Sequence, residues 1–263
     1  MLDYFIRFIG FVLSLIAVSV LTRVLVFDRF TIKGDSMEPT YADGQKVLVN
    51  KLLMGARIYT DYNFDQPELH CFRIPGVRRI RQGDVAVFNN PYERSVERIG
   101  FIINNVYAKR CIGCPGDTIT VSNGFYRNSS GQETLIPQPG QQMVSSMTDS
   151  LLREWVSIYK VYPWVEDLGW TIKNMGPLFV PGKGSTVLMD TVNALIYGRL
   201  IEYECGSKPT IYNERVWLNG VEMYKYVFKN NYFFFAGDNV LNSKDSRYIG
   251  LIPEDYIVGI VWP

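Results

Sequence analysis

A short turn-forming segment near the start of the chain contains a serine that could act as a nucleophile. The segment is GDSMEPT, residues 34–40, with the serine at position 36. Gly34 permits a positive φ angle, and Pro39 stiffens the chain just after Ser36. A serine in such a turn can present its hydroxyl and its backbone N–H to one substrate carbonyl, which is the geometry that acyl transfer requires. The same residues are also typical of an ordinary turn.

A second segment contains a lysine, Lys109, whose amine could be kept uncharged at neutral pH. Residues 106–112 alternate in the manner of a β-strand, so Lys109 shares a face with Tyr107 and Cys111. Apolar neighbours remove water from the amine, and desolvation lowers the pKa of a lysine. Neutralising an exposed lysine at pH 7 costs about 4.6 kcal/mol, and full burial shifts the pKa by about 3–5 units, which offsets that cost. A solvated strand lysine is the alternative interpretation.

A polar loop at residues 237–248 follows an apolar strand pattern at 232–236 and supplies a third group of side chains. A loop of this composition needs internal hydrogen bonds to keep one conformation. Asp245 and Arg247 can form an ion pair there, and Ser243 can orient another side chain. An ordinary polar loop with one salt bridge fits the same residues.

Histidine and cysteine usage restricts other chemistries. His70 is the only histidine, which excludes most multi-histidine metal sites, and it lies in a polar stretch outside the three segments above. Cys111 and Cys114 form a Cys-x-x-Cys pair, which fits a redox pair, half of a zinc site or two buried structural cysteines. We favour the buried structural role and predict no metal and no cofactor.

Composition indicates a globular protein that does not bind nucleic acid. Hydrophobic residues make up 47% of the 263 residues, which is enough to build a core. The formal net charge is +1, so the chain has no broad basic field for a polyanion.

The first residues of the chain have the composition of a membrane-spanning helix. The 24 residues between Asp3 and Asp28 contain only two charged side chains, Arg7 and Arg23. As a helix they extend about 36 Å, enough to cross a hydrocarbon core of about 30 Å, with both arginines near the interfaces. The alternatives are a buried core helix, a cleaved signal peptide and an interfacial helix, although two arginines are too few for the charged face of an interfacial helix. Counting positive charges on the two sides places the rest of the chain in the cytoplasm.

The rest of the chain predicts a mainly β fold that positions the three segments. Strand patterns occur at 30–33, 46–50, 85–88, 106–112, 118–121, 216–218, 232–236 and 256–261. Residues 55–82 are polar and predict a long loop, 189–203 predict a helix, and Asn219-Gly220 predicts a hairpin turn. We expect a membrane anchor at 1–29, a catalytic core at 30–121 and 216–263, and an inserted smaller cap domain at 122–215.

Four segments in this order resemble the successive conserved boxes of bacterial type I signal peptidases. They are GDSMEPT, GDVAVF, YAKRCIGCPGD and GDN-x2-NS-x-DSRY, and the predicted anchor precedes them. The resemblance covers about residues 5–121 and 216–263 and implies a signal-peptidase-like β core with no metal.

The resemblance also implies roles for individual residues. It implies a Ser-Lys dyad in which Ser36 attacks the scissile carbonyl and Lys109 accepts its proton. It implies that Ser243 positions the lysine and that Asp245 and Arg247 support the loop as an ion pair. The Ser36 backbone N–H would be one oxyanion donor, and the substrate-binding and oxyanion positions correspond to Gly34, Asp35, Met37 and Tyr107.

By this resemblance the protein removes signal peptides from exported preproteins, with its partners being those peptides and the phospholipid bilayer. It implies a single-pass protein of the bacterial cytoplasmic membrane with its catalytic domain on the outer, periplasmic face, against the charge count. Gly34 leaves the second oxyanion donor unidentified, while Val240, Leu241 and Ile249 depart from the usual last box. A specialised processing peptidase with few substrates and a catalytically silent, membrane-tethered peptide-binding module are the alternatives.

Overall fold

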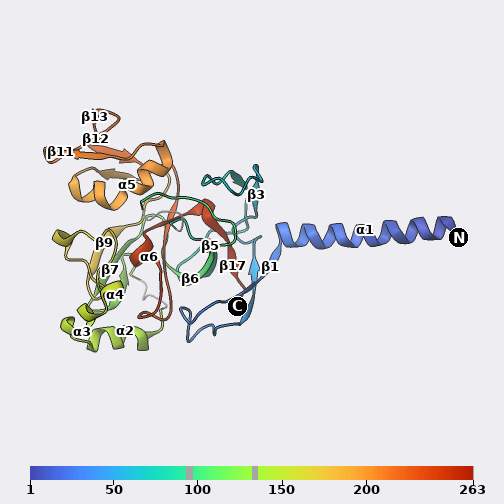
Figure 1. Ribbon diagram of the computed structural model, residues 1–263, viewed down its shortest axis with the longest axis horizontal. Helices are drawn as coiled ribbons and strands as arrows, with labels where there is room; N and C mark the ends of the chain where they lie inside the picture. Colours follow the sequence, from blue (N-terminus) through green and yellow to red (C-terminus); the bar gives the residue numbers. More distant parts are fainter. Residues whose placement is uncertain (93–96, 132–135, 263) are drawn as a thin grey trace.

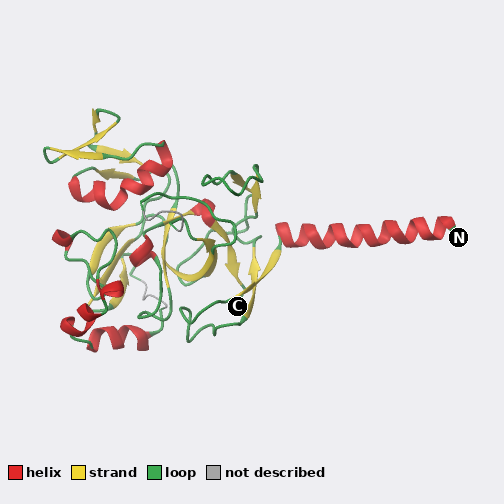
Figure 2. Ribbon diagram, in the orientation of Figure 1, coloured by secondary structure: helices red, strands yellow, loops and turns green. Residues whose placement is uncertain are grey.

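The computed structural model describes residues 1–92, 97–131 and 136–262, and its fold is mainly β, as predicted (Figures 1 and 2). One antiparallel sheet of seven strands has the order β1-β2-β17-β5-β6-β15-β16. In chain order these strands are β1 Phe27–Thr31, β2 Lys46–Asn50, β5 Val85–Asn89, β6 Val106–Gly113, β15 Tyr232–Ala236, β16 Ile252–Pro253 and β17 Ile257–Val261. Register shifts in the β15–β6 and β17–β5 pairings increase the local twist, which helps the sheet to curl.

Both faces of this sheet are buried at β5, β15 and β17, which explains why these strands are nearly continuous apolar runs. Val85 and Val87 point into one hydrophobic cluster, together with Met37. Ala86 and Phe88, the alternate residues of the same strand, point into a second cluster on the other face. Strands buried on both faces lose the alternation of a half-exposed strand.

A second sheet, with the order β8-β7-β9, lies between β6 and β15 of the main sheet along the chain. Its strands are β7 Thr118–Ser122, β8 Phe125–Asn128 and β9 Met175–Phe179. Between β8 and β9 lie α2 Gln138–Ser146, α3 Asp149–Glu154, α4 Val156–Tyr159 and the 3-10 helix η1 Glu166–Leu168. The pairing of β7 with β9 joins the two sides of the predicted boundary at residue 121, and the division into a core and a cap domain stays a prediction.

The predicted helix at 189–203 is confirmed as α5, Thr191–Cys205. The Asp190 side chain accepts a hydrogen bond from the Asn193 N–H and caps its first turn. Around it lie β10 Thr186–Leu188, β11 Thr210–Tyr212, β12 Arg215–Leu218, β13 Val221–Glu222 and β14 Lys225–Val227. The hairpin between β12 and β13 is also confirmed, because Asn219 and Gly220 have φ angles of 51° and 79°, as a type I′ turn requires.

The prediction of a long loop at 55–82 was wrong in part. The structure has a hairpin there, formed by β3 Arg57–Tyr59 and β4 Cys71–Arg73. The strands are three residues long, too short for a periodic pattern, and a long-range contact holds them in place. Arg73 donates hydrogen bonds to the carbonyls of Glu254 and Ile257, far along the chain. The short helices α6 Ser246–Ile249 and η2 Glu254–Tyr256 were also not predicted, and neither were α2, α3, α4 and η1.

The first helix, α1 Leu2–Leu25, projects away from the rest of the protein (Figure 1). Its segment Asp3–Leu25 has a mean hydropathy of 2.3 over its most apolar window, none of which is buried, so it is a candidate membrane span by length and composition. Only Val26 separates α1 from β1. Lys51 holds this junction, because its Nζ donates to the Arg23 carbonyl at 2.7 Å and to the Asp28 carboxylate at 3.2 Å.

Candidate active site

Ser36 and Lys109 lie in direct contact, although 73 positions separate them in the sequence. Ser36 is in the turn after β1, and Lys109 is in the middle of β6. The distance between Lys109 Nζ and Ser36 Oγ is 2.5 Å. The curled sheet thus brings together the two residues that the sequence singled out as nucleophile and base.

The amine of Lys109 is nearly removed from water, with only 5% of the residue exposed. Burial lowers the pKa of Lys109 from 10.5 to about 8, because the charged form loses its hydration. The carboxylate of Asp245 opposes this shift, and the guanidinium of Arg247 cancels part of that opposition. The Tyr107 ring, with its centroid 5.5 Å from Nζ, covers one side of the amine. The desolvation predicted from the strand pattern is therefore present.

The turn around Ser36 leaves a backbone donor free. Gly34 has a φ of +75°, a conformation that glycine adopts without strain, and its N–H donates to Asp43 at 2.7 Å. Within the part of the chain that the structure describes, the Ser36 N–H has no protein acceptor. It can donate to an oxygen placed beside the serine hydroxyl. The Gly34 N–H is already engaged and cannot be the second donor without moving.

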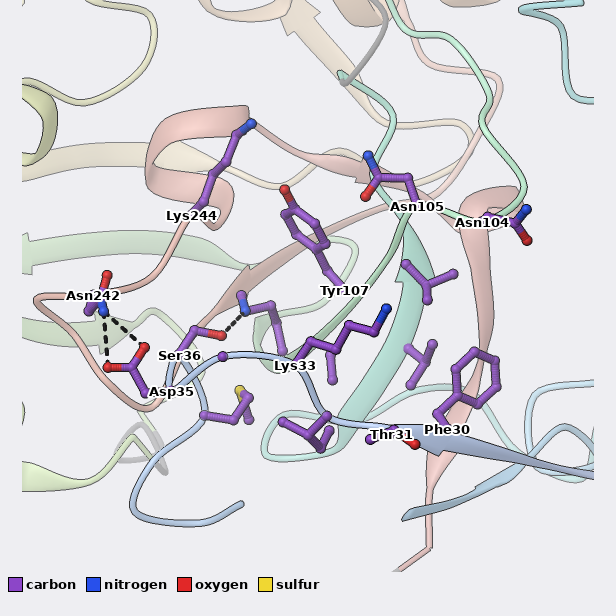
Figure 3. A pocket seen from close by; sticks show the side chains of 17 residues that line it. Phe30, Thr31, Lys33, Asp35, Ser36, Asn104, Asn105, Tyr107, Asn242 and Lys244 are labelled. Carbon is purple, nitrogen blue, oxygen red and sulfur yellow. Dashed lines mark hydrogen bonds between the residues drawn. The ribbon is translucent and has the colours of Figure 1, made fainter. Parts of the chain in front are cut away.

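Two asparagines that the sequence reasoning did not assign fasten this turn to the 237–248 loop. The Asn239 N–H donates to the Ser36 carbonyl at 3.1 Å, and the Asn239 side chain donates to the Asp35 carbonyl at 3.3 Å. The Asn242 amide donates to both oxygens of the Asp35 carboxylate, at 2.9 and 3.0 Å (Figure 3). Asp35, predicted at the substrate-binding position, thus braces the turn. The two asparagines in the GDN-x2-N pattern were the sequence signal that could have indicated this role.

Asp238 and Arg110 form a second brace that was not predicted. Asp238 is 1% exposed and accepts two hydrogen bonds from the Arg110 guanidinium, at 2.7 and 2.5 Å. The Thr40 hydroxyl also donates to Asp238. Arg110 follows Lys109 on β6, and successive strand residues point to opposite faces. This network therefore ties β6 to both segments beside the serine without contacting it.

Asp245 and Arg247 form the ion pair that the sequence predicted. Two hydrogen bonds of 2.9 and 2.8 Å join the guanidinium to the carboxylate, and both side chains are buried. Although burial alone would raise it, the pKa of Asp245 is held below its usual range by Arg247. Asp245 also accepts from the Gly237 N–H, and Arg247 donates to the Val240 carbonyl. The pair therefore fixes both ends of the loop.

Ser243 lies in this loop but makes no contact of the kind that the resemblance implied. It is buried, and a Cβ on Gly237 would come within 2.1 Å of its Oγ. Its hydroxyl lies on the Asp245 side, where it helps to keep that carboxylate charged, but it makes no hydrogen bond of normal geometry among the described residues. No hydrogen bond joins Ser243 to Lys109 among the described residues, and the positioning role of Ser243 stays a prediction.

The departures in the last box are accommodated by packing. Val240 is 1% exposed in a hydrophobic cluster, where it lies against Gly140 of α2. Ile249 is buried in another cluster. Both are core residues here, and neither lines the pocket described next.

A pocket of about 500 Å³ opens beside Ser36 (Figure 3). One wall is formed by residues 30–37 and the other by residues 104–109. Tyr107 stands in the second wall, and Met37, which has no exposed surface, lies under the first. Gly34 and Asp35 are also among the lining residues. The predicted substrate-binding positions therefore surround one cavity next to the Ser36 hydroxyl.

The other candidate groups lie elsewhere. His70 is exposed and does not line this pocket, so it forms no triad with Ser36 within the described part of the chain. No group of three or more His, Cys, Asp or Glu side chains suited to a metal ion is present among the described residues. Cys111 is fully buried beside Cys114.

Comparison with known proteins gives a consistent result. A family model described as "Signal peptidase, peptidase S26" matches residues 5–133 and 192–262. Signal peptidase I of Buchnera aphidicola subsp. Acyrthosiphon pisum is 23% identical over 256 residues, which is 97% of this chain and 73% of that protein. Signal peptidase I of Pseudomonas aeruginosa is 31% identical over 161 residues, 57% of this chain and 49% of that protein. Signal peptidase I of Helicobacter pylori is 24% identical over 252 residues, 94% of this chain and 77% of that protein.

Proposed function

The chain belongs to the signal peptidase family, peptidase S26, and we propose that it is a membrane-anchored serine endopeptidase that removes signal peptides from exported preproteins. The observation that carries this proposal is the 2.5 Å contact between Ser36 Oγ and a buried lysine whose pKa is lowered to about 8. A neutral amine at that distance can accept the hydroxyl proton, and a charged one cannot.

In the first half of the reaction, Ser36 Oγ attacks the scissile carbonyl carbon while its proton passes to the neutral Lys109 Nζ. The carbonyl oxygen becomes negatively charged and accepts a hydrogen bond from the Ser36 N–H. The C–N bond then breaks, Lys109 returns the proton to the leaving amine, and an ester on Ser36 remains. In the second half, Lys109 takes a proton from water, the hydroxide attacks the ester, and the proton returns to Ser36.

The pocket suits an extended peptide with small side chains near the cleaved bond. Its two walls are extended segments, the end of β1 with residues 32–34 and the start of β6. A strand lying between them brings one carbonyl to Ser36. Val106 and Ala108, which are both partly exposed, give the pocket an apolar surface there, which suits small residues in shallow subsites.

In this proposal α1 anchors the enzyme, and the catalytic part lies outside the cytoplasmic membrane. The 24 residues of α1 reach about 36 Å. A substrate whose apolar segment lies in the same bilayer meets the site at a raised local concentration. The outer placement follows the family and not the positive charges that flank α1.

A penem-type β-lactam tests the nucleophile. Ser36 Oγ is expected to open the lactam ring and to form an ester, so the intact protein gains the mass of one probe and loses cleavage of a preprotein in detergent in the same proportion. Peptide mapping should place the adduct on Ser36. The exposed serine Ser122 of β7 is the internal control and should stay unmodified. Cleavage without labelling at Ser36, or labelling elsewhere, would contradict the proposal.

Activity should rise with pH in a way set by Lys109. Because the pKa of Lys109 is lowered to about 8, only about a tenth of the molecules have a neutral amine at pH 7. We expect kcat/KM for a substrate without titrating groups to rise about tenfold per pH unit below 8 and to level off above it. A profile that is flat between pH 6 and 9, or that rises only near 10.5, would show that Lys109 is not the base.

A further inference from the structure

Two cysteines lie in contact just beyond Lys109. Cys111 is the second residue after Lys109 on β6, and Cys114 is in the turn that follows. Their sulfur atoms are 3.7 Å apart, and both thiols are free. Because both side chains stand on one short segment, the sulfurs can approach each other without moving a distant part of the chain.

The surroundings of the pair favour a thiol–disulfide reaction over metal binding. No third metal-binding side chain joins the two sulfurs among the described residues. The thiol of Cys111 lies against the carbonyl of Gly113 and that of Cys114 against the carbonyl of Ile80, each at 3.6 Å. Carbonyl oxygens are poor partners for a zinc thiolate site but leave the two thiols able to react with each other.

The two thiols differ in access and in acidity. Cys111 has no exposed surface, and burial raises the pKa of its thiol. Cys114 is partly exposed, and a hydrogen bond with the Cys111 thiol lowers the pKa of Cys114, although burial opposes this. Reactivity toward external disulfides requires an accessible thiolate. Cys114 therefore has the properties of an attacking thiol, and Cys111 those of a resolving thiol.

We propose that Cys111 and Cys114 are a redox modification site that forms an intramolecular disulfide by exchange with a small-molecule disulfide. The Cys114 thiolate attacks one sulfur of that compound and forms a bond to it, the S–S bond of the compound breaks, and its other sulfur leaves as a thiolate, so a mixed disulfide remains on Cys114. The Cys111 thiol then loses its proton and attacks the Cys114 sulfur, which expels the second thiolate. The protein loses two protons and two electrons in total, which is the mass of two hydrogen atoms, and the external disulfide is reduced to two thiols.

The bond would brace the strand that carries the base. It closes a ring between the end of β6 and the turn that follows. This turn already contacts the segment just after β9, because the Gly116 N–H donates to the Val180 carbonyl at 2.8 Å. The modification depends on this geometry alone and not on the peptidase activity, so either can fail without the other.

The test uses oxidised glutathione and intact-protein mass measurement on the full chain in detergent. The background variant is Cys71→Ser/Cys205→Ser, which leaves only the pair; neither of these cysteines has a thiol partner in the structure. Treated protein should lose two hydrogens, carry no glutathione and lose both alkylatable thiols, and reductant should reverse the change. Adding Cys111→Ser should trap glutathione on Cys114, while adding Cys114→Ser should leave the buried Cys111 unmodified.

Three outcomes would overturn the proposal. They are two free thiols after treatment, a lasting glutathione adduct in the background variant, and trapping on Cys111 instead of Cys114. The first two need no change at either cysteine of the pair, so they stand even if a serine at position 111 prevents folding.

Discussion

Replacing Lys109 with methionine is expected to abolish peptide cleavage and, at the same time, to make the folded protein more stable. Removing a general base typically costs a factor of about 10²–10⁴ in rate. Here the loss should reach that of Ser36→Ala, because the two residues act as one unit and their effects do not add. Methionine has nearly the same length and no charge to bury.

The gain in stability follows from the lowered pKa of Lys109. A lysine whose folded pKa is about 8, against 10.5 in the unfolded chain, weakens folding wherever the unfolded chain has a charged amine, because folding must then bury the charge or release the proton. The penalty is fully present below pH 8, shrinks between 8 and 10.5, and is gone above that range. A shift of this size corresponds to roughly 3 kcal/mol, an upper value for the gain of Lys109→Met at pH 7.

Thermal unfolding of the full chain in detergent, measured at pH 7 and near pH 10.5, checks this second effect. The methionine variant should unfold at a higher temperature at pH 7, and the difference should shrink at the higher pH. Lys225→Met is the matched control, because Lys225 of β14 is exposed and far from the pocket lining. It should leave activity and stability unchanged. An inactive Lys109→Met variant that is less stable would indicate a damaged fold and not a missing base.

Asp245→Asn is expected to destabilise the protein more than any change at an exposed ion pair. The substitution keeps the size of the side chain but leaves the Arg247 guanidinium buried without a counter-charge. Breaking a buried pair on one side costs about 3–5 kcal/mol. Cleavage should fall with it, because the 237–248 loop holds the Ser36 turn through Asn239 and Asn242.

The double variant Asp245→Leu/Arg247→Met separates the charge from the packing. Because apolar replacement of a whole buried pair is often tolerated, this protein should be more stable than Asp245→Asn in denaturant unfolding. Glu166→Gln removes a partner of the exposed Lys160–Glu166 pair and should change little. If all three variants lost the same small amount of unfolding free energy, the buried pair would contribute no more to stability than the exposed pair.

The local sequence pattern was enough to predict most strands and the ion pair of the 237–248 loop. The strands at 46–50 and 232–236 match β2 and β15 in both bounds, because each is a short apolar or alternating run bounded by turn residues. The Asp245–Arg247 pair lies two residues apart, so sequence proximity alone makes it plausible.

Contacts between segments that are distant in the sequence could not be predicted from the local sequence pattern. Arg110 and Asp238 are 128 positions apart, and neither residue type indicates its partner. The same holds for Asn242 and Asp35. The contact between Ser36 and Lys109 was expected only through the family resemblance, since the strand pattern indicated desolvation of the lysine but not what would face it.

The junction between α1 and β1 has a consequence for which bond in a substrate can be cut. Lys51 holds the end of the helix and the start of the strand together, and only eleven positions separate Leu25 from Ser36. With α1 in a bilayer, the serine can stand no more than about 35–40 Å from the end of the helix along an extended chain. The enzyme would then select the bond to be cut partly by its distance from the membrane surface. A bond would be accepted when the membrane-embedded segment of the substrate holds it at the same distance from the bilayer as Ser36.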